Sequence, residues 1–386
     1  MRKYWKVVAI LALIVVGVST YLVQTALASQ DLPRFEIEHK NGDESVVEDV
    51  SFSGAYVQHN IQNVFRFDGE ETEYSIESSF IEEMIGSKGP VEEELIEKYR
   101  DFMRGKPYLY NNFYNGDDAL VIVEEDWNYT GQSRAKLNVS YLNKETEKEL
   151  ETVINVENAH YANVIEVQYM DGRIHIYVNY AEQESRILRE FIYDVEGEAI
   201  VSDKKILETK EPEGQGFTEI NKLTESVTYQ PTQFMVIRAT DVLLEEGLNG
   251  DFHEKERDEG LYRYDIKNGE LSELDLPSEE YGHANRFDGK YLYFEQPTEG
   301  EQLLIKPYDI VEEKFINDIE LHPSGQKNHQ MTFSYEVYDQ KLYVLNGLNL
   351  KVIDVATGET IYEGEIVTKG NVDLDQVRLD TIINFD

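Results

Sequence analysis

Clustered side-chain oxygens are the first feature of this chain that could do chemistry. Asn249, Asp251, Glu254 and Asp258 fall within one acidic stretch, which we interpret as a surface loop. Carboxylate and amide oxygens are the ligands that calcium prefers, although the spacing matches no regular calcium loop. Asp251, Glu254 and Asp258 are therefore weak metal candidates and calcium is the one cofactor suggested, with a solvated run of charge as the competing interpretation.

The common catalytic signatures do not occur in the sequence. It contains no G-x-S-x-G elbow, H-E-x-x-H helix, P-loop or EF-hand loop, and without cysteine it lacks thiol catalysis, disulfides and zinc–thiolate sites. His322 and His329 are the only close histidines, and the segment between them fits no standard zinc site. The aromatic residues that could form a platform for a sugar are Trp127, Tyr129 and Tyr141. Catalytic residues stay unassigned, because an active site would have to be assembled from distant parts of the chain.

Repeating strands are the elements that must position such residues. From Pro107 onward, a strand of alternating apolar residues is followed by a second strand that ends in Asp, and then by a turn. Asp265, Asp309 and Asp354 are spaced within the roughly 40–50-residue period of propeller blades. We expect these residues, and Asp194 in an earlier copy, to accept hydrogen bonds from the turn that follows each of them.

A change of period marks an insertion into this pattern. Between about residues 79 and 105 the apolar residues recur every 3.6 positions, with Leu95, Tyr99 and Met103 on one face and Pro90 where a helix would begin. The pattern predicts a short helical insertion that either packs over a sheet or forms a gate or partner surface.

The two ends of the chain also contain strands. Asn41-Gly42-Asp43 is typical of a hairpin turn, here between Phe35–His39 and Ser45–Val50. At the other end, Arg378–Phe385 resembles a short final strand. If the two ends share one blade, this strand should pair beside a segment of Phe35–Val57.

The stretch from Leu342 to Ile361, LYVLNGLNLKVIDVATGETI, resembles the YVTN-type repeat of bacterial envelope and secreted β-propellers. The residues that carry the resemblance are Tyr343, Val344, Asn346, Gly347, Asp354 and Gly358. It is close over this stretch alone, and it implies a fold and a tendency towards binding. We therefore predict an all-β fold, a β-propeller of about six to eight blades, with a two-domain β sandwich as the alternative.

The N-terminus predicts export. Arg2, Lys3 and Lys6 precede an uncharged apolar run, and small residues at Ala26 and Ala28 suit a signal peptidase. The run is also about long enough to span a bilayer. Residues 1–28 are thus a signal peptide or a signal anchor, and residues 31–386 are an extracytoplasmic domain, secreted or membrane-anchored. The lack of cysteine suits a Gram-positive envelope.

The net charge and the absence of the common catalytic motifs together limit the possible functions. The formal net charge of −40 repels nucleic acid and anionic lipid headgroups. We therefore expect a non-catalytic propeller that binds a protein or a small molecule at one face. A propeller hydrolase or lyase, with Asp or Glu and His converging from several blades, is an alternative. An accessory subunit of a membrane sensor or transporter is a third possibility, favoured if the anchor is retained.

Overall fold

The computed structural model describes the greater part of the chain beyond the N-terminal segment. The described residues are 32–48, 50–58, 61–69, 71–75, 95–106, 112–126, 134–212, 214, 216–223, 232–246, 252–276, 283–298, 302–322, 333–369 and 376–385, with 16, 17 and 20 nearer the N-terminus. The predicted signal or anchor falls almost wholly outside them. Among the described residues, no helix has the length and apolar character needed to cross a bilayer.

The chain folds into two compact units. Unit 1 comprises Met1–Ser87, Glu295–Pro307 and Phe315–Asp386, and unit 2 comprises Lys88–Phe294 and Tyr308–Lys314. Each unit is built from antiparallel sheets, in which strands with alternating apolar residues bury their side chains against neighbouring sheets of the same unit.

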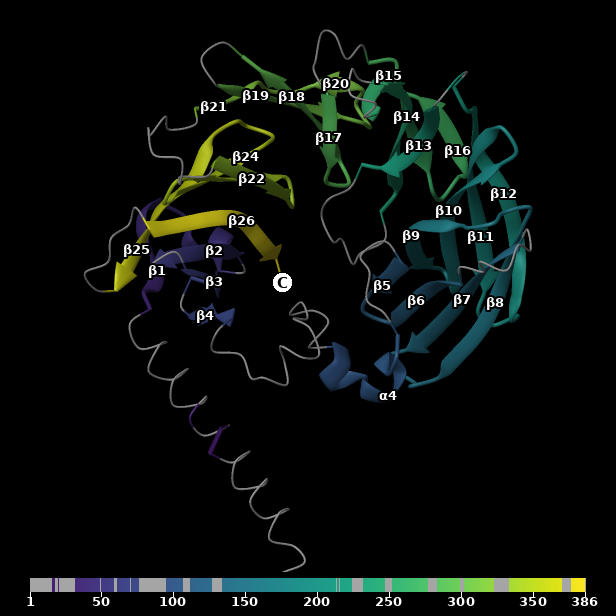
Figure 1. The fold of residues 1–386 in the computed structure, drawn as a ribbon, viewed down its shortest axis with the longest axis horizontal. Helices are drawn as coiled ribbons and strands as arrows, with labels where there is room; N and C mark the ends of the chain where they lie inside the picture. The colour runs from purple at the N-terminus through teal and green to yellow at the C-terminus, as the bar shows by residue number, and fades with distance from the viewer. Residues whose placement is uncertain are drawn as a thin grey trace, which may run out of the picture. The chain divides into compact units, whose positions relative to one another are not determined.

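Unit 2 contains three four-stranded sheets that follow one another along the chain (Figure 1). The first is β5 (Phe113–Asn115), β6 (Ala119–Asp126), β7 (Arg134–Asn143) and β8 (Glu149–Glu157). The second is β9 (Asn163–Met170), β10 (Arg173–Glu182), β11 (Ser185–Asp194) and β12 (Ala199–Lys210). The third is β13 (Gly216–Lys222), β14 (Phe234–Glu246), β15 (Phe252–Asp265) and β16 (Glu270–Glu273). In each sheet, strands adjacent in sequence are paired, as in a propeller blade.

Unit 1 contains two sheets that each combine both ends of the chain. One has the order β1 (Arg34–Gly42), β25 (Thr360–Lys369), β24 (Asn349–Asp354), β23 (Lys341–Asn346) and β22 (Phe333–Tyr338). The other has the order β26 (Val377–Phe385), β2 (Val50–Gln58), β3 (Ile61–Phe67) and β4 (Thr72–Tyr74). A further sheet consists of β17 (His283–Phe287), β18 (Tyr291–Pro297), β19 (Leu303–Asp309), β20 (Lys314–Phe315) and β21 (Ile319–Leu321).

These sheets confirm the prediction of an all-β fold of the β-propeller type. Consecutive strands form separate up-and-down meanders, whereas a sandwich domain exchanges strands between two sheets through Greek-key connections. The range of six to eight blades stays a prediction.

The predicted pairing of the two chain ends is also confirmed. The C-terminal strand β26 runs antiparallel to β2, with Tyr56 opposite Val377 and Phe52 opposite Ile382. Figure 1 shows β26 alongside β2 within this sheet.

The predicted hairpin at Asn41-Gly42-Asp43 is wrong. Gly42 does take the positive φ that such a turn favours, at 97°. However, β1 continues through Gly42 and pairs with β25, and the chain then enters the 3₁₀ helix η1 (Glu44–Val47). Asp43 caps this helix through its Oδ1, which accepts the Ser45 N–H at 3.0 Å. Long-range pairing has therefore outweighed the local turn preference.

The recurring Asp residues accept hydrogen bonds from their turns, as predicted. Their Oδ1 atoms accept backbone N–H groups as follows: Asp194 from Gly197 at 2.6 Å, Asp265 from Asn268 at 2.9 Å, Asp309 from Val311 and Glu312 at 2.9 Å each, and Asp354 from Thr357 at 2.8 Å. Asn143 plays the same role in the copy that ends in β7, accepting the Thr146 N–H at 2.8 Å. These carboxylates are thus part of the fold.

The fourth residue after each of these acceptors adopts a left-handed conformation. The φ values are 55° for Glu147, 50° for Glu198, 66° for Gly269, 53° for Glu313 and 73° for Gly358. A side chain with a Cβ is disfavoured in this region by about 1–2 kcal/mol, so three of the five turns carry strain that glycine removes in the other two.

We expect Glu198→Gly to stabilise the protein by about 0.5–1 kcal/mol, because the relief of strain exceeds the extra freedom that glycine gives the unfolded chain. Glu198 is exposed, so the substitution removes no packing. Urea unfolding measures the change. The reciprocal variant Gly358→Glu should lose stability, and a loss in both variants would contradict the strain argument.

The described part of the helical insertion packs over a sheet. Residues 95–98 and α4 (Arg100–Met103) are helical, and the Met103 N–H donates to the Tyr99 carbonyl at 2.9 Å. Leu95, Phe102 and Met103 are buried in one apolar cluster with side chains of the β5–β8 sheet. Residues 79–94 lie outside the described part, so the length of the insertion stays a prediction.

Candidate functional site

A buried carboxylate connects two neighbouring sheets of unit 2. Glu190 on β11 is 2% exposed and accepts three hydrogen bonds. Its Oε1 accepts the Tyr177 hydroxyl at 2.8 Å and lies 3.1 Å from His175 Nδ1, both on β10. Its Oε2 accepts the hydroxyl of Tyr264 on β15 at 2.9 Å. We call these four residues the Glu190 cluster.

The alternation of β10 explains how the cluster forms. His175 and Tyr177 are two residues apart and so point to the same side of the sheet, where Tyr177 lies opposite Glu190 in the register. Tyr177 shares an apolar cluster with Tyr264 and Ile237 of the next sheet. The polar groups are therefore surrounded by apolar packing.

Hydrogen bonding controls the ionisation of Glu190. Burial by itself would raise the pKa of its carboxyl group, but the hydrogen bonds from His175, Tyr177 and Tyr264 favour the charged form and hold the pKa below its usual value. For both tyrosines, burial and the adjacent negative charge raise the pKa of the hydroxyl group. The cluster is thus an ionised carboxylate held by neutral tyrosines.

The geometry of the cluster does not favour catalysis. A histidine beside a carboxylate is a common acid–base pair, yet a reacting group must reach it. His175 is 7% exposed and Glu190 is fully enclosed. A cavity lined partly by Glu166, which lies opposite Tyr177 in the register, and by Gln168 and Lys222 has a volume of about 10 Å³. This is room for one water molecule at most.

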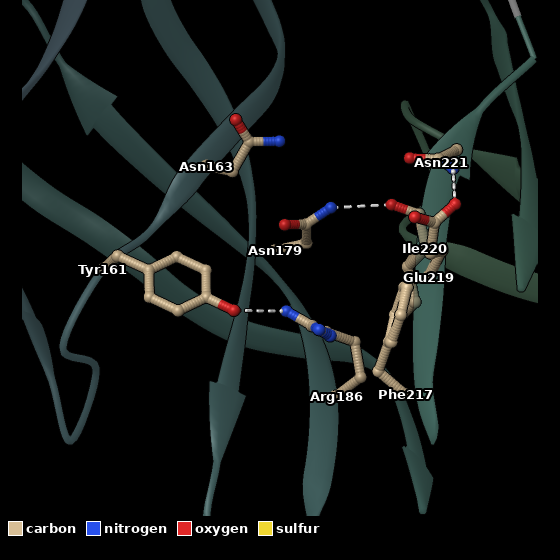
Figure 2. Close-up of a pocket in the computed structure, with 8 residues that line it drawn as sticks. All are labelled: Tyr161, Asn163, Asn179, Arg186, Phe217, Glu219, Ile220 and Asn221. Atoms are coloured by element: carbon tan, nitrogen blue, oxygen red, sulfur yellow. Dashed lines mark hydrogen bonds between the residues drawn. The ribbon is translucent and has the colours of Figure 1, made fainter. Parts of the chain in front are cut away.

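A larger pocket opens at another place between the same two sheets, and we call it the β9–β13 pocket. Its volume is about 250 Å³, just below the range of about 300–1,000 Å³ that is usual for drug-sized ligands. The residues that line it are Tyr161, Asn163, Asn179, Arg186, Phe217, Glu219, Ile220 and Asn221 (Figure 2). They come from β9, β10, β11 and β13 and from the segment before β9.

Arg186 forms a fixed wall of the β9–β13 pocket. Its Nε donates to the Thr218 carbonyl at 2.9 Å, and its Nη1 donates to the Tyr161 hydroxyl at 2.8 Å. Glu211 lies 3.6 Å from Nε and itself accepts the Thr218 N–H at 2.5 Å. The guanidinium group is therefore positioned before any ligand arrives.

Asn179 forms the floor of the pocket. It is 7% exposed, and its Nδ2 donates to the Ile220 carbonyl at 2.6 Å. Figure 2 shows its Oδ1 turned the other way, toward Asn163 and Tyr161. Within the described part of the chain, no group donates a hydrogen bond to this oxygen. The oxygen is therefore open to the pocket, where a ligand or a water molecule can donate a hydrogen bond to it.

The structure describes only part of the predicted metal site, so calcium binding there stays a prediction. Asp251 lies outside the described residues, while Glu254 and Asp258 belong to β15, which pairs with β14 in a long hairpin. The interpretation of this stretch as a loop is wrong, because the strands continue through most of it. Among the residues that the structure describes, no group of three or more metal-ligating side chains comes together.

We expect added sodium chloride to raise the melting temperature, because acidic side chains are dense along the β14–β15 hairpin and repel one another at low salt. Lys255, which forms an ion pair with Glu245 at 3.1 Å, compensates one of them. Calcium at equal ionic strength should add at most a small further rise. A calcium-specific gain in stability above about 4 kcal/mol, as expected near 1,000 times a dissociation constant, would make Asp251, Glu254 and Asp258 metal ligands.

The other candidates from the sequence that the structure describes do not line the pocket. His322 is exposed and 3.9 Å from Glu320, and His329 lies outside the described residues. Tyr141 is buried and 3.2 Å from the Tyr169 hydroxyl, so it is not a surface platform for a sugar. Trp127 and Tyr129 also lie outside the described residues.

Sequence reasoning missed the residues of both the pocket and the Glu190 cluster. Asn163, Asn179 and Glu219 lie on three strands of two sheets, and no local spacing marks them. The alternation of His175 and Tyr177 was visible, but nothing near it in the sequence points to Glu190.

Comparison with known proteins yields no family for this chain. No protein-family model matches it, and no curated protein matches it. Solved structures with some likeness include a PL25 ulvan lyase, at 11% identity over 84% of this chain and 81% of that chain, with a TM-score of 0.34. The periplasmic gluconolactonase of Pseudomonas aeruginosa has 12% identity over 87% of this chain and 99% of that chain, with a TM-score of 0.30. The β-propeller domain of the Trilobed protease from Pyrococcus furiosus has 9% identity over 85% of this chain and 84% of that chain, with a TM-score of 0.27. At such TM-scores the likeness carries no argument about this protein, so the fold assignment rests on the sheets described above.

Proposed function

We propose that this protein is a non-catalytic binding protein of the bacterial envelope and that it takes a small polar ligand in the β9–β13 pocket. The observation that carries the proposal is Asn179 Oδ1, an acceptor that lacks a described donor and is open to a pocket of about 250 Å³. Arg186, already held in place by Thr218 and Tyr161, adds a rigid wall. Preorganised polar groups of this kind favour binding, because little entropy is lost when they meet a ligand.

The lining of the pocket supports binding over hydrolysis or elimination. Among its eight lining residues, Glu219 is the one carboxylate, and there is no histidine. A propeller hydrolase or lyase of the kind considered above would need paired carboxylates and a base within reach of one substrate. The location in the envelope rests on the basic N-terminus and the apolar run that follows it.

A pocket-filling variant tests this function. Asn163 lies at the exposed rim of the pocket and its side chain has no described hydrogen-bond partner, so Asn163→Trp should close the pocket without loss of stability. Asn155, an exposed asparagine on β8, is the matched control, and Asn155→Trp should have no effect. Saturation-transfer NMR against a set of sugars, amino acids, polyamines and small acids measures binding.

We expect at least one compound class to bind the wild type and Asn155→Trp but not Asn163→Trp, and to be recovered unchanged by mass spectrometry. Binding that survives in Asn163→Trp, or no binding at all, would refute the pocket as the site. Conversion of a bound compound would establish the hydrolase or lyase alternative. Intact mass of the native protein shows whether the chain begins near Ser29 or at Met1, and thus whether the signal is removed.

A further inference from the structure

The charges around the β9–β13 pocket disfavour an anionic ligand. Arg186 is the one cation among its lining residues, and Glu211 already lies 3.6 Å from its Nε. Glu219 adds an exposed carboxylate at the rim. The formal net charge of −40 also repels anions as they approach the protein. The site therefore favours a ligand that is neutral or cationic.

The hydrogen-bonding groups of the pocket fit hydroxyl groups. Asn179 Oδ1 offers an acceptor at the floor, and the Asn163 amide offers both donors and an acceptor at the rim. Glu219 accepts the Asn221 Nδ2 at 3.2 Å and keeps further acceptor capacity. A hydroxyl group can donate to one of these atoms and accept from another, whereas an ammonium group only donates.

Two aromatic side chains complete the site. Tyr161 is 39% exposed and Phe217 is half-buried, and both line the pocket. An aromatic ring offers an apolar face for the C–H groups of a sugar, while amides and carboxylates at its side bind the hydroxyls. Building on the function proposed above, we propose that the ligand is a neutral carbohydrate and that one sugar residue enters the pocket.

The test is a binding titration with probes of different charge. Variants of the pocket show whether each probe binds there. The probes are methyl glycosides of neutral hexoses and their linear oligosaccharides, with glucuronic acid as the anionic probe and spermidine as the cationic probe. For the neutral sugars we expect Asn163→Ala to weaken binding about tenfold, by the loss of direct hydrogen bonds. Asn155→Ala, on the exposed face of β8, should leave the affinity unchanged.

Glu219→Gln separates neutral from cationic ligands. The variant keeps the shape and the acceptor oxygen of the side chain but removes its charge, so the affinity for a neutral sugar should stay within about threefold. A cationic ligand that uses the carboxylate should lose about tenfold or more.

The outcomes distinguish this inference from the function on which it rests. Binding of neutral sugars that depends on Asn163 supports both the pocket as the binding site and the neutral carbohydrate as its ligand. Binding of spermidine or glucuronic acid that depends on Asn163, without binding of neutral sugars, overturns the carbohydrate and leaves the pocket function standing. If no probe binds in an Asn163-dependent way, and the Asn163→Trp screen also fails, both are overturned.

Discussion

Replacement of Glu190 by alanine should destabilise the protein by about 3–5 kcal/mol, measured by urea unfolding at pH 7. The reason is that three donors, from His175, Tyr177 and Tyr264, would each lose their buried acceptor. Removing one partner from a buried charged network leaves the others desolvated and unpaired, which is among the most costly single changes in a folded protein.

Two variants distinguish the loss of hydrogen bonds in the Glu190 cluster from the loss of packing volume. Glu190→Gln keeps the volume but places an amide nitrogen where an acceptor is required, so it should also lose stability, by a smaller amount. The triple variant Glu190→Leu, Tyr177→Phe and Tyr264→Phe removes the acceptor and two donors together. It should recover much of the loss, because apolar replacement of a polar network is often close to neutral, and the remaining loss comes from His175, which stays without its acceptor. If the triple variant is no better than Glu190→Ala, packing explains the effect.

The difference in stability between the wild type and Glu190→Gln should depend on pH, because the pKa of Glu190 is lowered in the folded protein. A carboxyl group whose pKa is lower in the folded state contributes stability above its unfolded pKa, which is near 4.3, and loses that contribution as the pH falls through the folded value. The stability advantage of the wild type over Glu190→Gln should therefore be largest at neutral pH and shrink below about pH 4. An advantage that grows on acidification would contradict the ionised state of Glu190.

Truncation of the chain after Gln376 should unfold the two sheets of unit 1 that contain the chain ends, at a cost of about 5 kcal/mol or more. The deletion removes β26, whose Val377 and Leu379 are each 3% exposed in the apolar cluster of this unit. Burial of two such side chains contributes about 1.5–3 kcal/mol each, and β2 also loses the hydrogen bonds that it makes with β26. Hydrogen exchange should show loss of protection in β2 and β3 and retention in β9–β11.

Two controls accompany the truncation. Leu379→Ala keeps the strand and should cost about 2–4 kcal/mol, by the cavity that it leaves. A synthetic peptide of residues 377–386 should restore protection in β2 when added to the truncated protein, because an unpaired strand edge is a template for another strand. Unchanged protection of β2 in the truncated protein would show that β26 is dispensable.

Local interactions were the part of the fold that sequence reasoning could predict. The hydrogen bonds of Asp194 and Asp354 connect residues three apart, so side-chain chemistry and position were sufficient. The pairing of β26 with β2 followed from the need to satisfy both ends of the chain. The Asn41-Gly42 hairpin failed because β25, more than three hundred residues away, supplies the partner of β1. The pocket could not be predicted from the sequence for the same reason. Asn163 and Asn179 line it together with Glu219 only because two sheets pack against each other.

The pairing of strands from the two ends of the chain sets an order of events during folding. Arg34 pairs beside Lys369, and Val50 beside Phe385, so each sheet of unit 1 that holds an N-terminal strand is incomplete until the C-terminal strands are present. Contacts of such long sequence separation form slowly, because a long loop must close before any of them is made. The meanders of unit 2 need only their own nearby residues and can form earlier. Until the C-terminal strands pair, the edges of β1 and β2 that they cover are exposed, and these edges are where a chaperone would be needed most.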